Sequence, residues 1–399
     1  MAGKPNALIV GSKRSPVGKF GGPLSRLKAT VLAGIMIESA LSDCGIGKDD
    51  VDEVVMGMAI QAGAGPNPAR LASLAAGIPS HVPAITVNGQ CISGMKAVEI
   101  ACDRILLGKA RVVVAGGVES LSRVPYLLEG TRRGSGPGDL TLYDGIYRDS
   151  LMDPTCGCHL GLTVEDLAVE YGVTRSEVDK FAFQSHQRAV RARADLAEEI
   201  APVEVPSSHG GAGITVQFDE PVRLDSSLEG LATLRPAYPR GNLITSGNSP
   251  GLTDGAIAVV VVSSEMVADR GLKTLGRIQA AVTTAVDPAR MALGPVVAIK
   301  ALLKKTGLRL SDIRLFEINE AFGAQMCICQ RELQIPEDRL NVNGGAIALG
   351  HPFGFTGARL VTTLLYELRR RGGGRGIAAT CSGGGPAMAV LVESVPLQV

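Results

Sequence analysis

Cys91 stands where the sequence could make a thiol nucleophilic. It follows Val-Asn-Gly-Gln, at the end of an expected strand and the start of an expected helix. The dipole and unpaired N–H groups of a helix N-terminus stabilise a thiolate, the form of cysteine that attacks carbonyl carbon. A buried structural cysteine is the alternative interpretation.

His351 lies in the glycine-rich run GAIALGHPFGFTG, outside any expected helix or strand. Backbone geometry in such a loop can fix an imidazole ring as a base or hydrogen-bond donor. Taken alone, a histidine of this kind also fits a structural role.

Cys381 ends an expected strand over 377–380 and precedes three glycines, so the N–H of Gly383 could stabilise an oxyanion. Asn319, in the run NEAF, ends another expected strand over 315–318. The alternatives are a packed strand terminus for Cys381 and a turn or helix cap for Asn319.

The elements that carry these residues alternate between strands and helices. Runs that are apolar on both faces predict buried strands at 7–10, 51–56, 112–115 and 256–262. Apolar residues at three- and four-residue spacing, Met95, Val98, Cys102 and Ile105, predict a helix over 93–107 that Gly108 ends. The pattern is βαβ and indicates an α/β fold.

The chain contains an internal repeat. ALSDCGI followed by DVDEVVM resembles LLKKTGL followed by DIRLFEI, and each copy is followed by Val-Asn-Gly. Six positions separate Val87 from Ser93, but fourteen separate Val342 from Thr356, and the eight extra positions contain His351. We therefore expect two related halves whose difference marks a site of chemistry.

Residues 121–244 belong to neither repeat. Because a structureless loop of this length is implausible, we expect them to fold as a subdomain that covers one face of the core. The expected organisation is an N-terminal half over 1–120 completed by 245–270, the insert over 121–244, and a C-terminal half over 271–399.

Composition excludes several classes of protein. The 399 residues, 45% hydrophobic and 20% charged, are those of a folded chain with a large core. With 40 Lys+Arg against 39 Asp+Glu, no overall field attracts nucleic acid or an anionic membrane. No run has the roughly 18 apolar residues of a membrane span. We expect neither kind of partner.

The cysteines favour a reduced compartment. There are eight, without CxxC pairs, and neither MAGKPNALIV nor PLQV reads as a targeting signal, so we expect a cytoplasmic protein with free thiols. Cys156-Gly-Cys158 and Cys327-Ile-Cys329 lack the spacing of a zinc site, and we expect no metal.

Four motifs resemble those of the thiolase family, in order and over nearly the whole chain: VNGQCISGMKA, NEAF, GGAIALGHPFGFTGAR and CSGGGPAMA. The resemblance implies an α/β protein with duplicated βαβαβαββ halves in a layered α/β/α/β/α arrangement and an inserted loop domain. It also implies an acyltransferase that performs reversible Claisen chemistry on coenzyme A thioesters. Acyl-CoA and CoA would be its substrates, with no cofactor, and it would form a homodimer or homotetramer.

The resemblance assigns a role to each candidate residue. Cys91 carries the acyl group and His351 takes its proton. Cys381 is the acid/base at the substrate α-carbon and at the leaving thiol. Asn319, through a water, and His351 stabilise the enolate oxygen, and the N–H groups of Cys91 and Gly383 form a second oxyanion hole. The insert would bind coenzyme A, and the implied substrate contacts are His159, Leu160, Arg223, Tyr238, Ser246, Met291, Ala321 and Phe322.

Three functions agree with this resemblance. His159-Leu-Gly falls where short-chain members carry His-Met-Gly, which favours an acetyl-CoA C-acetyltransferase that condenses two acetyl-CoA to acetoacetyl-CoA. A degradative 3-ketoacyl-CoA thiolase of fatty-acid β-oxidation is the alternative, because one methylene changes discrimination by only about 1–3 kcal/mol. Pro250 and Gly230 replace two serines that approach coenzyme A in the family, which leaves a non-catalytic acyl-CoA or lipid carrier as the third.

Overall fold

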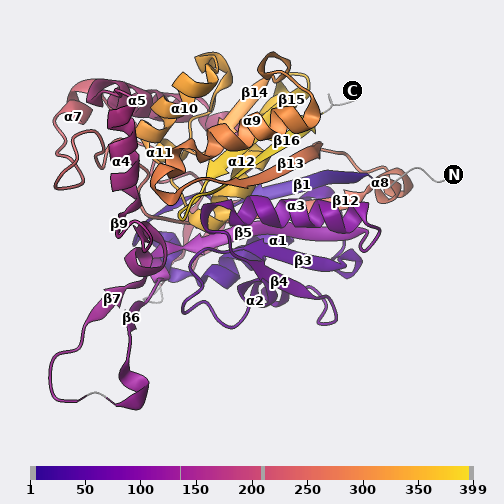
Figure 1. Cartoon of the computed structure of the whole chain (residues 1–399). Coiled ribbons are helices and arrows are strands. Elements are labelled where there is room, and N and C mark those ends of the chain that lie inside the picture. Colours follow the sequence, from indigo (N-terminus) through magenta and orange to yellow (C-terminus); the bar gives the residue numbers. More distant parts are fainter. Residues whose placement is uncertain (1–5, 135, 208–211, 395–399) are drawn as a thin grey trace.

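The computed structural model describes residues 6–134, 136–207 and 212–394 (Figure 1). The chain ends examined for a targeting signal, 1–5 and 395–399, lie outside these residues, as do 135 and 208–211 of the insert. Within the described ranges, no helix is both long enough and apolar enough to span a bilayer.

The N-terminal half is built on a sheet with one central antiparallel strand from late in the sequence. The order is β1 (Ala7–Arg14), β12 (Thr253–Ser263), β5 (Val112–Ser120), β3 (Glu53–Gly57) and β4 (Ala84–Val87), with β2 (Gly18–Lys19) also paired to β12. β12 is antiparallel to β1 and β5, whereas β3 is parallel to β5 and β4. The four apolar runs predicted as strands all lie in this sheet.

The C-terminal half repeats that arrangement. Its sheet has the order β13 (Arg277–Ala285), β16 (Pro386–Ser394), β15 (Gly374–Cys381) and β14 (Leu315–Ile318). Strand directions correspond, since β16 is antiparallel to β13 and β15, and β14 is parallel to β15. A parallel bridge from Phe316 to Leu340 takes the place of the β3–β4 pair. The repeat predicted from sequence is confirmed.

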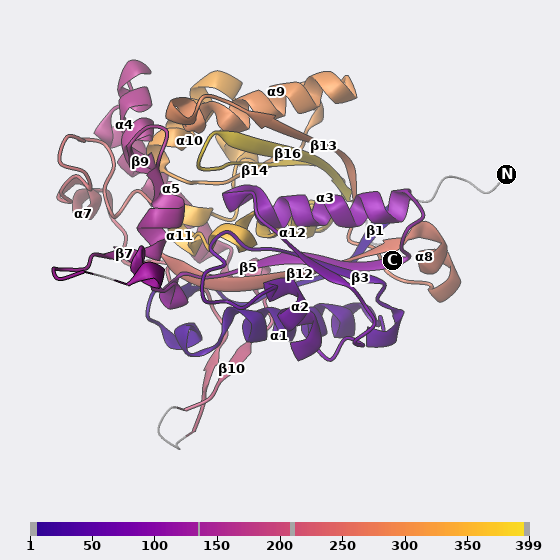
Figure 2. The ribbon, with the colours of Figure 1, turned by 60° about the horizontal axis from the view of Figure 1, so that its bottom comes forward.

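Helices complete five layers. α3 (Ser93–Leu106) and α12 (Phe353–Arg370) lie between the two sheets (Figure 2). α1 (Ala29–Cys44) and α2 (Pro68–Ala75) cover the outer face of the first sheet, and α9 (Gly294–Thr306) and α10 (Gly323–Leu333) cover that of the second. One apolar cluster joins both sheets through the central helices, including Val98, Val259, Leu360 and Val390. The layered α/β/α/β/α fold is confirmed.

The segment between β5 and β12 contacts both halves. Its helices α4 (Leu160–Glu170) and α5 (Arg175–Arg191) share an apolar cluster with α9 and α10. The hairpin of β10 (Val203–Val205) and β11 (Ile214–Val216) instead packs with α1. The smaller elements of this segment are β6 (Tyr126–Leu128), β7 (Leu142–Asp144), β8 (Met152–Asp153), β9 (Cys158–His159), α6 (Arg193–Ala197) and α7 (Leu228–Ala232). The short helices α8 (Ser264–Arg270) and α11 (Ala346–Leu349) lie outside it.

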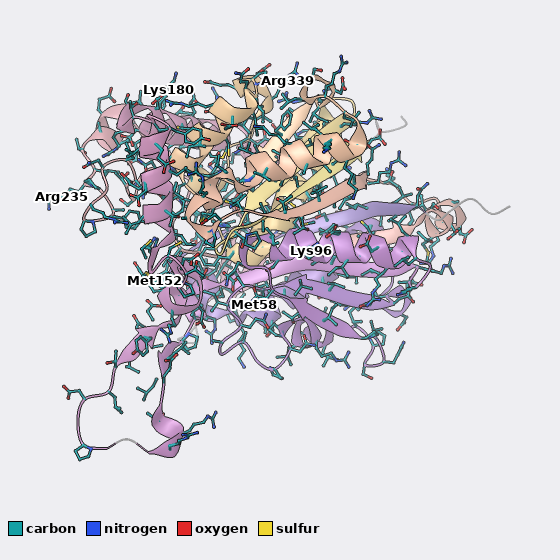
Figure 3. The ribbon with its side chains drawn as sticks, viewed as in Figure 1. Met58, Lys96, Met152, Lys180, Arg235 and Arg339 are labelled. Carbon is teal, nitrogen blue, oxygen red and sulfur yellow. The ribbon has the colours of Figure 1, made fainter. Side chains whose placement is uncertain are left out.

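β6 and β7 form an arm that projects from the body (Figure 1). Met152, labelled in Figure 3, lies where the arm rejoins the body. The arm carries exposed apolar side chains, including Tyr126 and Leu142, which are 65% and 61% exposed.

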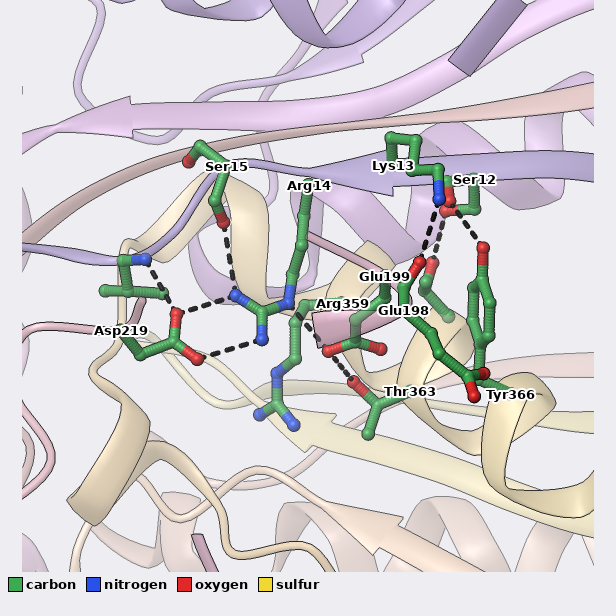
Figure 4. A network of polar contacts seen from close by, with 12 residues as sticks. Ser12, Lys13, Arg14, Ser15, Glu198, Glu199, Asp219, Arg359, Thr363 and Tyr366 are labelled. Carbon is green, nitrogen blue, oxygen red and sulfur yellow. Dashed lines mark hydrogen bonds and ion pairs between the residues drawn. The ribbon is translucent and has the colours of Figure 1, made fainter. Parts of the chain in front are cut away.

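A buried polar network fastens the segment after α6 to β1 and α12 (Figure 4). The Arg14 guanidinium donates to Glu199 at 2.6 Å and to both carboxylate oxygens of Asp219 at 2.7 and 2.9 Å. Burial alone would lower the pKa of Arg14, but the two carboxylates raise it above its ordinary value. Thr363 donates to Glu199 from α12. Arg14 also donates to the Ser15 carbonyl at 3.1 Å, so this buried cation is compensated by two carboxylates and a carbonyl oxygen.

Candidate active site

Cys91 lies in a single 3-10 turn, Gln90–Ile92, between β4 and α3. Gln90 immediately before it has a positive φ of 56°, an uncommon conformation for a residue other than glycine. Ser93 fixes the turn, because its hydroxyl donates to Gln90 O and accepts from the Gly89 N–H. The Gln90 side chain also contacts the segment over the cavity, donating to Asp149 O and accepting from Ser150.

His351 lies between α11 and α12, with its backbone N–H donating to the Thr253 hydroxyl at 3.0 Å. The glycine-rich run therefore contains the short helix α11, but the histidine itself is outside any helix or strand, as predicted. Nδ1 is 2.7 Å from the Thr356 hydroxyl, which donates its own hydrogen to Pro352 O. Thr356 can thus only accept from the ring, so Nδ1 carries the proton and Nε2 presents a lone pair.

Asn319 and Cys381 end the neighbouring strands β14 and β15. The Asn319 backbone N–H donates to Ala379 O, and its side-chain Nδ2 lies 3.3 Å from His351 Nε2. Asn319 Oδ1 is buried without a hydrogen-bond partner. The amide is therefore a positioned polar group beside the imidazole rather than a helix cap.

Burial controls the protonation states of the three reactive groups. It lowers the pKa of His351 to about 3, with Arg359 adding to the effect, so the imidazole is neutral. Burial raises the pKa of the Cys381 thiol to about 12. Burial also raises the pKa of Cys91, and the N–H groups of Cys91 and Gly383 oppose it only in part. The expected stabilisation of thiolate by the helix N-terminus is therefore outweighed by desolvation.

The two halves meet here through direct backbone contact. A Cβ on Gly117 of β5 would stand 1.9 Å from Gly354 O, and one on Gly354 would stand 2.7 Å from Met58 Cα. α12 therefore begins against the ends of β3 and β5, and only glycine permits that approach. This contact places the His351 loop of one half beside the Cys91 turn of the other.

A cavity of about 180 Å³ joins most of the predicted site residues. Its wall includes Cys91, His159, Leu160, Tyr238, Met291, Ala321, Phe322, His351, Cys381 and Gly383. Asn319 lies fully buried behind His351. Arg223 and Ser246 are exposed and do not contribute to the wall.

His159 is held in the wall by its neighbours. Its Nδ1 accepts the Gly161 N–H at 3.0 Å, and its ring lies between those of Tyr147 and Tyr238, at 5.8 and 4.9 Å between centroids. Burial lowers its pKa. The neutral ring therefore keeps its proton on Nε2, and His159 is an uncharged donor.

Sequence reasoning missed several residues of the site. Ser150, Leu151, Leu252 and Phe353 line the cavity. Leu151 and Leu252 pack with Phe353 in one small cluster, although about 100 positions separate them in the chain, and no local pattern could have joined them. The contact between Thr356 and His351 could have been predicted from the sequence, because Thr356 lies five residues after His351 on the first turn of the following helix.

The comparisons with known proteins agree with this geometry. The thiolase N-terminal domain family matches residues 7–265, and the thiolase C-terminal domain family matches 272–394. An acetyl-CoA acetyltransferase of Chromobacterium violaceum is 42% identical over 387 residues, 96% of this chain and 98% of its own. The chain belongs to the thiolase family.

Solved structures have the same fold. The crystal structure of the Bacillus anthracis acetyl-CoA acetyltransferase superposes with a TM-score of 0.96 at 38% identity, covering 99% of this chain and 100% of its own. The human mitochondrial 3-ketoacyl-CoA thiolase in complex with CoA superposes with a TM-score of 0.91 at 38% identity, covering 98% of each chain.

Proposed function

We propose that this protein is an acetyl-CoA C-acetyltransferase that reversibly condenses two acetyl-CoA to acetoacetyl-CoA and CoA. The observation that carries the proposal is the convergence of two thiols and one neutral imidazole, Cys91, Cys381 and His351, on a single cavity. The acetyl-CoA acetyltransferase relatives agree with it over nearly the full chain. Presence of the complete site argues against a non-catalytic carrier.

The first step is acylation of Cys91. Its sulfur attacks the thioester carbonyl of acetyl-CoA as the thiol proton moves to His351 Nε2, the ring nitrogen that carries no hydrogen. Proton transfer and attack are coupled, because the free site stabilises neither thiolate nor imidazolium. The N–H groups of Cys91 and Gly383, which face the sulfur, are placed to stabilise the carbonyl oxyanion. The C–S bond to CoA then breaks, and CoA leaves as its thiol after taking the proton from His351.

The second step forms the carbon–carbon bond. Cys381 gives its thiol proton to His351 Nε2 and, as a thiolate, removes a proton from the α-carbon of a second acetyl-CoA. Asn319 and the Nε2–H that His351 now carries stabilise the resulting enolate oxygen. The enolate carbon attacks the acetyl carbonyl on Cys91, the Cys91 C–S bond breaks, and Cys381 passes the α-proton to the leaving thiolate and recovers its own proton from His351. Acetoacetyl-CoA is released with both cysteines restored as thiols.

The substrate contacts follow from the cavity wall. We place the acyl group against Leu160, Met291 and Phe322, and the pantetheine chain along Pro250 and Tyr238. Ser246 and the Arg223 cation, both exposed beyond the wall, would meet the anionic nucleotide. The His186 ring accepts the Arg223 N–H and orients that segment. Gly230 is exposed on α7, and a Cβ at this position would stand 3.1 Å from Ser227 Oγ.

CoA-dependent cleavage tests the function. Acetoacetyl-CoA is compared with medium- and long-chain 3-ketoacyl-CoA, and Cys91→Ala is the blank. We expect preference for acetoacetyl-CoA. Preference for longer chains would identify a degradative 3-ketoacyl-CoA thiolase, like the human mitochondrial relative, and no Cys91-dependent cleavage would revive the carrier function.

We also propose that the protein forms a homodimer or homotetramer. β4 is the last strand of its sheet, with Ile85 exposed by 38%, and an open strand edge invites pairing. The β6–β7 arm carries exposed Tyr126 and Leu142. Light scattering after size-exclusion chromatography should report two or four chains, whereas a monomer at micromolar concentration would contradict this proposal.

The remaining expectations join the proposal. We place the reaction in the cytoplasm, consistent with eight free cysteines, all in the described part of the chain. The reaction as written needs only acyl-CoA and CoA, with no cofactor or metal. The division into halves over 1–120 with 245–270 and 271–399, and a CoA-binding insert over 121–244, agrees with β12 completing the first sheet.

A further inference from the structure

Glu119 occupies an unusual position for a carboxylate that no step of the mechanism uses. It is the second-last residue of β5 and is fully buried. Its carboxylate accepts three backbone N–H groups, from Ala59 at 2.9 Å, Ile60 at 3.1 Å and Gly354 at 2.9 Å. A buried carboxylate with this many donors is costly to replace, because each N–H would lose its partner.

One oxygen of this carboxylate joins the two halves. Oε2 accepts both from Ala59, in the N-terminal half, and from Gly354, on the first turn of α12 three residues after His351. Oε1 accepts only from Ile60. A single hydrogen bond, from the Gly354 N–H at the start of α12, therefore holds the His351 loop against Glu119.

Hydrogen bonds also connect the same oxygen to the turn that carries Cys91. Ala59 O accepts from the Asn88 side-chain amide at 2.8 Å, and Asn88 Oδ1 accepts from the Gln90 N–H at 2.9 Å. Gln90 is the left-handed residue directly before Cys91. A continuous series of hydrogen bonds therefore runs from the nucleophile turn through Asn88, Ala59 and Glu119 to the base loop.

We propose that Glu119 is a positioning residue that sets the distance between Cys91 and His351 by holding both loops on one carboxylate. The inference deepens the proposed function and rests on it. Burial raises the pKa of Glu119 to about 7 despite the three N–H donors, with Asp254 of β12 adding to the rise, and this agrees with a carboxyl selected for geometry rather than for charge. An error of about 1 Å in a reacting pair can cost a hundredfold in rate.

The test compares two substitutions of Glu119 in acetoacetyl-CoA thiolysis, with sites counted by iodoacetamide labelling of Cys91. Glu119→Asp withdraws the carboxylate by one methylene and breaks the bridge, so kcat per labelled site should fall at least tenfold with KM changed less than twofold. Glu119→Gln keeps an oxygen for Ala59 and Gly354 and loses only the Ile60 contact, so kcat should stay within threefold.

Glu199→Asp is the matched control, because it shortens another buried glutamate, the partner of Arg14 and Thr363, outside the catalytic loops. We expect it to lower Tm without changing kcat per labelled site. Should Glu119→Asp not fold, Asn88→Ala breaks the same series at an exposed residue and should lower kcat about fivefold at unchanged Tm.

The outcomes distinguish a failure of the positioning role from a failure of the proposed function. Folded Glu119→Asp, or Asn88→Ala in its place, with kcat within twofold of wild type would overturn the positioning role. So would equal losses of kcat in Glu119→Asp and Glu199→Asp, since both would then report stability alone. A wild-type protein that does not cleave acetoacetyl-CoA would contradict the proposed function before any variant is measured.

Discussion

The N-terminal half reaches its central helix α3 by a short turn from Val87 to Ser93, whereas the C-terminal half takes fourteen positions from Val342 to Thr356 to enter α12. The short turn presents Cys91 and the long connection presents His351. Because the sheets behind them have the same strand order, the two connections open toward one cavity. Duplication has supplied the frame, and the difference between the copies has supplied the nucleophile and its base.

The strand ends show a second difference between the halves. β14 and β15 of the C-terminal half end at the polar side chains Asn319 and Cys381, which face the site. β5 of the N-terminal half ends instead near Glu119, which accepts only backbone N–H groups. One half therefore carries most of the reactive groups, while the other carries the nucleophile and the support beneath it.

Removing the nucleophile should have the largest effect. Cys91→Ala deletes the only group that we assign to acyl transfer, and we expect kcat for thiolysis to fall by about 10⁴-fold or more. Steady-state thiolysis of acetoacetyl-CoA measures it. Cys44→Ala, at a half-buried thiol of α1, is the control and should stay within twofold. If the Cys91→Ala enzyme kept a tenth of wild-type activity, the assignment of the nucleophile to the N-terminal half would be wrong.

Cys381→Ala should separate the acylation step from the carbon–carbon bond-forming step. Without the acid/base group, condensation and thiolysis should fall by about 10³-fold. Acetylation of Cys91 by acetyl-CoA should continue, because His351 takes that proton. Quenched mixtures analysed by peptide mass spectrometry would measure this step, and loss of acetylation equal to the loss of turnover would show that the two thiols do not have separate roles.

Thr356→Val should have a smaller effect. Valine keeps the shape but removes the hydroxyl that accepts His351 Nδ1–H, so the ring loses its fixed tautomer. We expect about tenfold lower kcat, which corresponds to one lost hydrogen bond of about 1.4 kcal/mol. Thr362→Val is the control, because Thr362 lies six residues further along α12 and its hydroxyl is hydrogen-bonded to Ser12 instead. Equal kcat values for the two variants would show that the reaction does not depend on the His351 tautomer that Thr356 holds.

Acid should destabilise the fold through its buried histidines. Burial lowers the pKa of His351 to about 3 and that of His186 to about 4, from 6.5. The unfolded chain takes up these protons first, so the contribution to stability is complete above pH 6.5 and is lost as pH falls toward 4. We expect His351→Gln to reduce the fall of Tm between pH 7 and 4.5 by about 2 °C. An unchanged slope would mean that the ring is already charged in the fold.

The smallest effect is expected at the entrance rather than between the halves. Pro250 lines the cavity without an N–H or hydroxyl to offer. Pro250→Ser should lower KM for acetoacetyl-CoA by about two- to fivefold, the value of one modest hydrogen bond, with kcat unchanged. A change in kcat instead would indicate that Pro250 acts on the reacting groups.

Local pattern was sufficient for the elements and for the reactive residues themselves. Both apolar faces of 256–262 predicted a buried strand. The expected completion of the N-terminal half by 245–270 did not come from this local pattern, which does not indicate that β12 pairs between β1 and β5. That placement depends on pairing across more than 100 residues. The gapless repeat, by contrast, predicted the second sheet, because two similar sequences bury similar faces.

The protonation states could not be predicted in the same way. A helix start beside Cys91 favours thiolate, but the cost of burial depends on the wall that Leu151, Leu252 and Phe353 build from distant segments. For Arg223 and Ser246 the difference is one of position. The family resemblance implied that both contact the substrate, but neither lies in the cavity wall.

The most direct test of the central claim is to locate the acetyl group after Cys381→Ala protein is mixed with acetyl-CoA and digested. We predict one acetylated peptide, modified at Cys91, which disappears when His351 is also replaced by alanine. Acetylation at another residue, or at Cys91 with no dependence on His351, would contradict the assignment of nucleophile and base to the two halves.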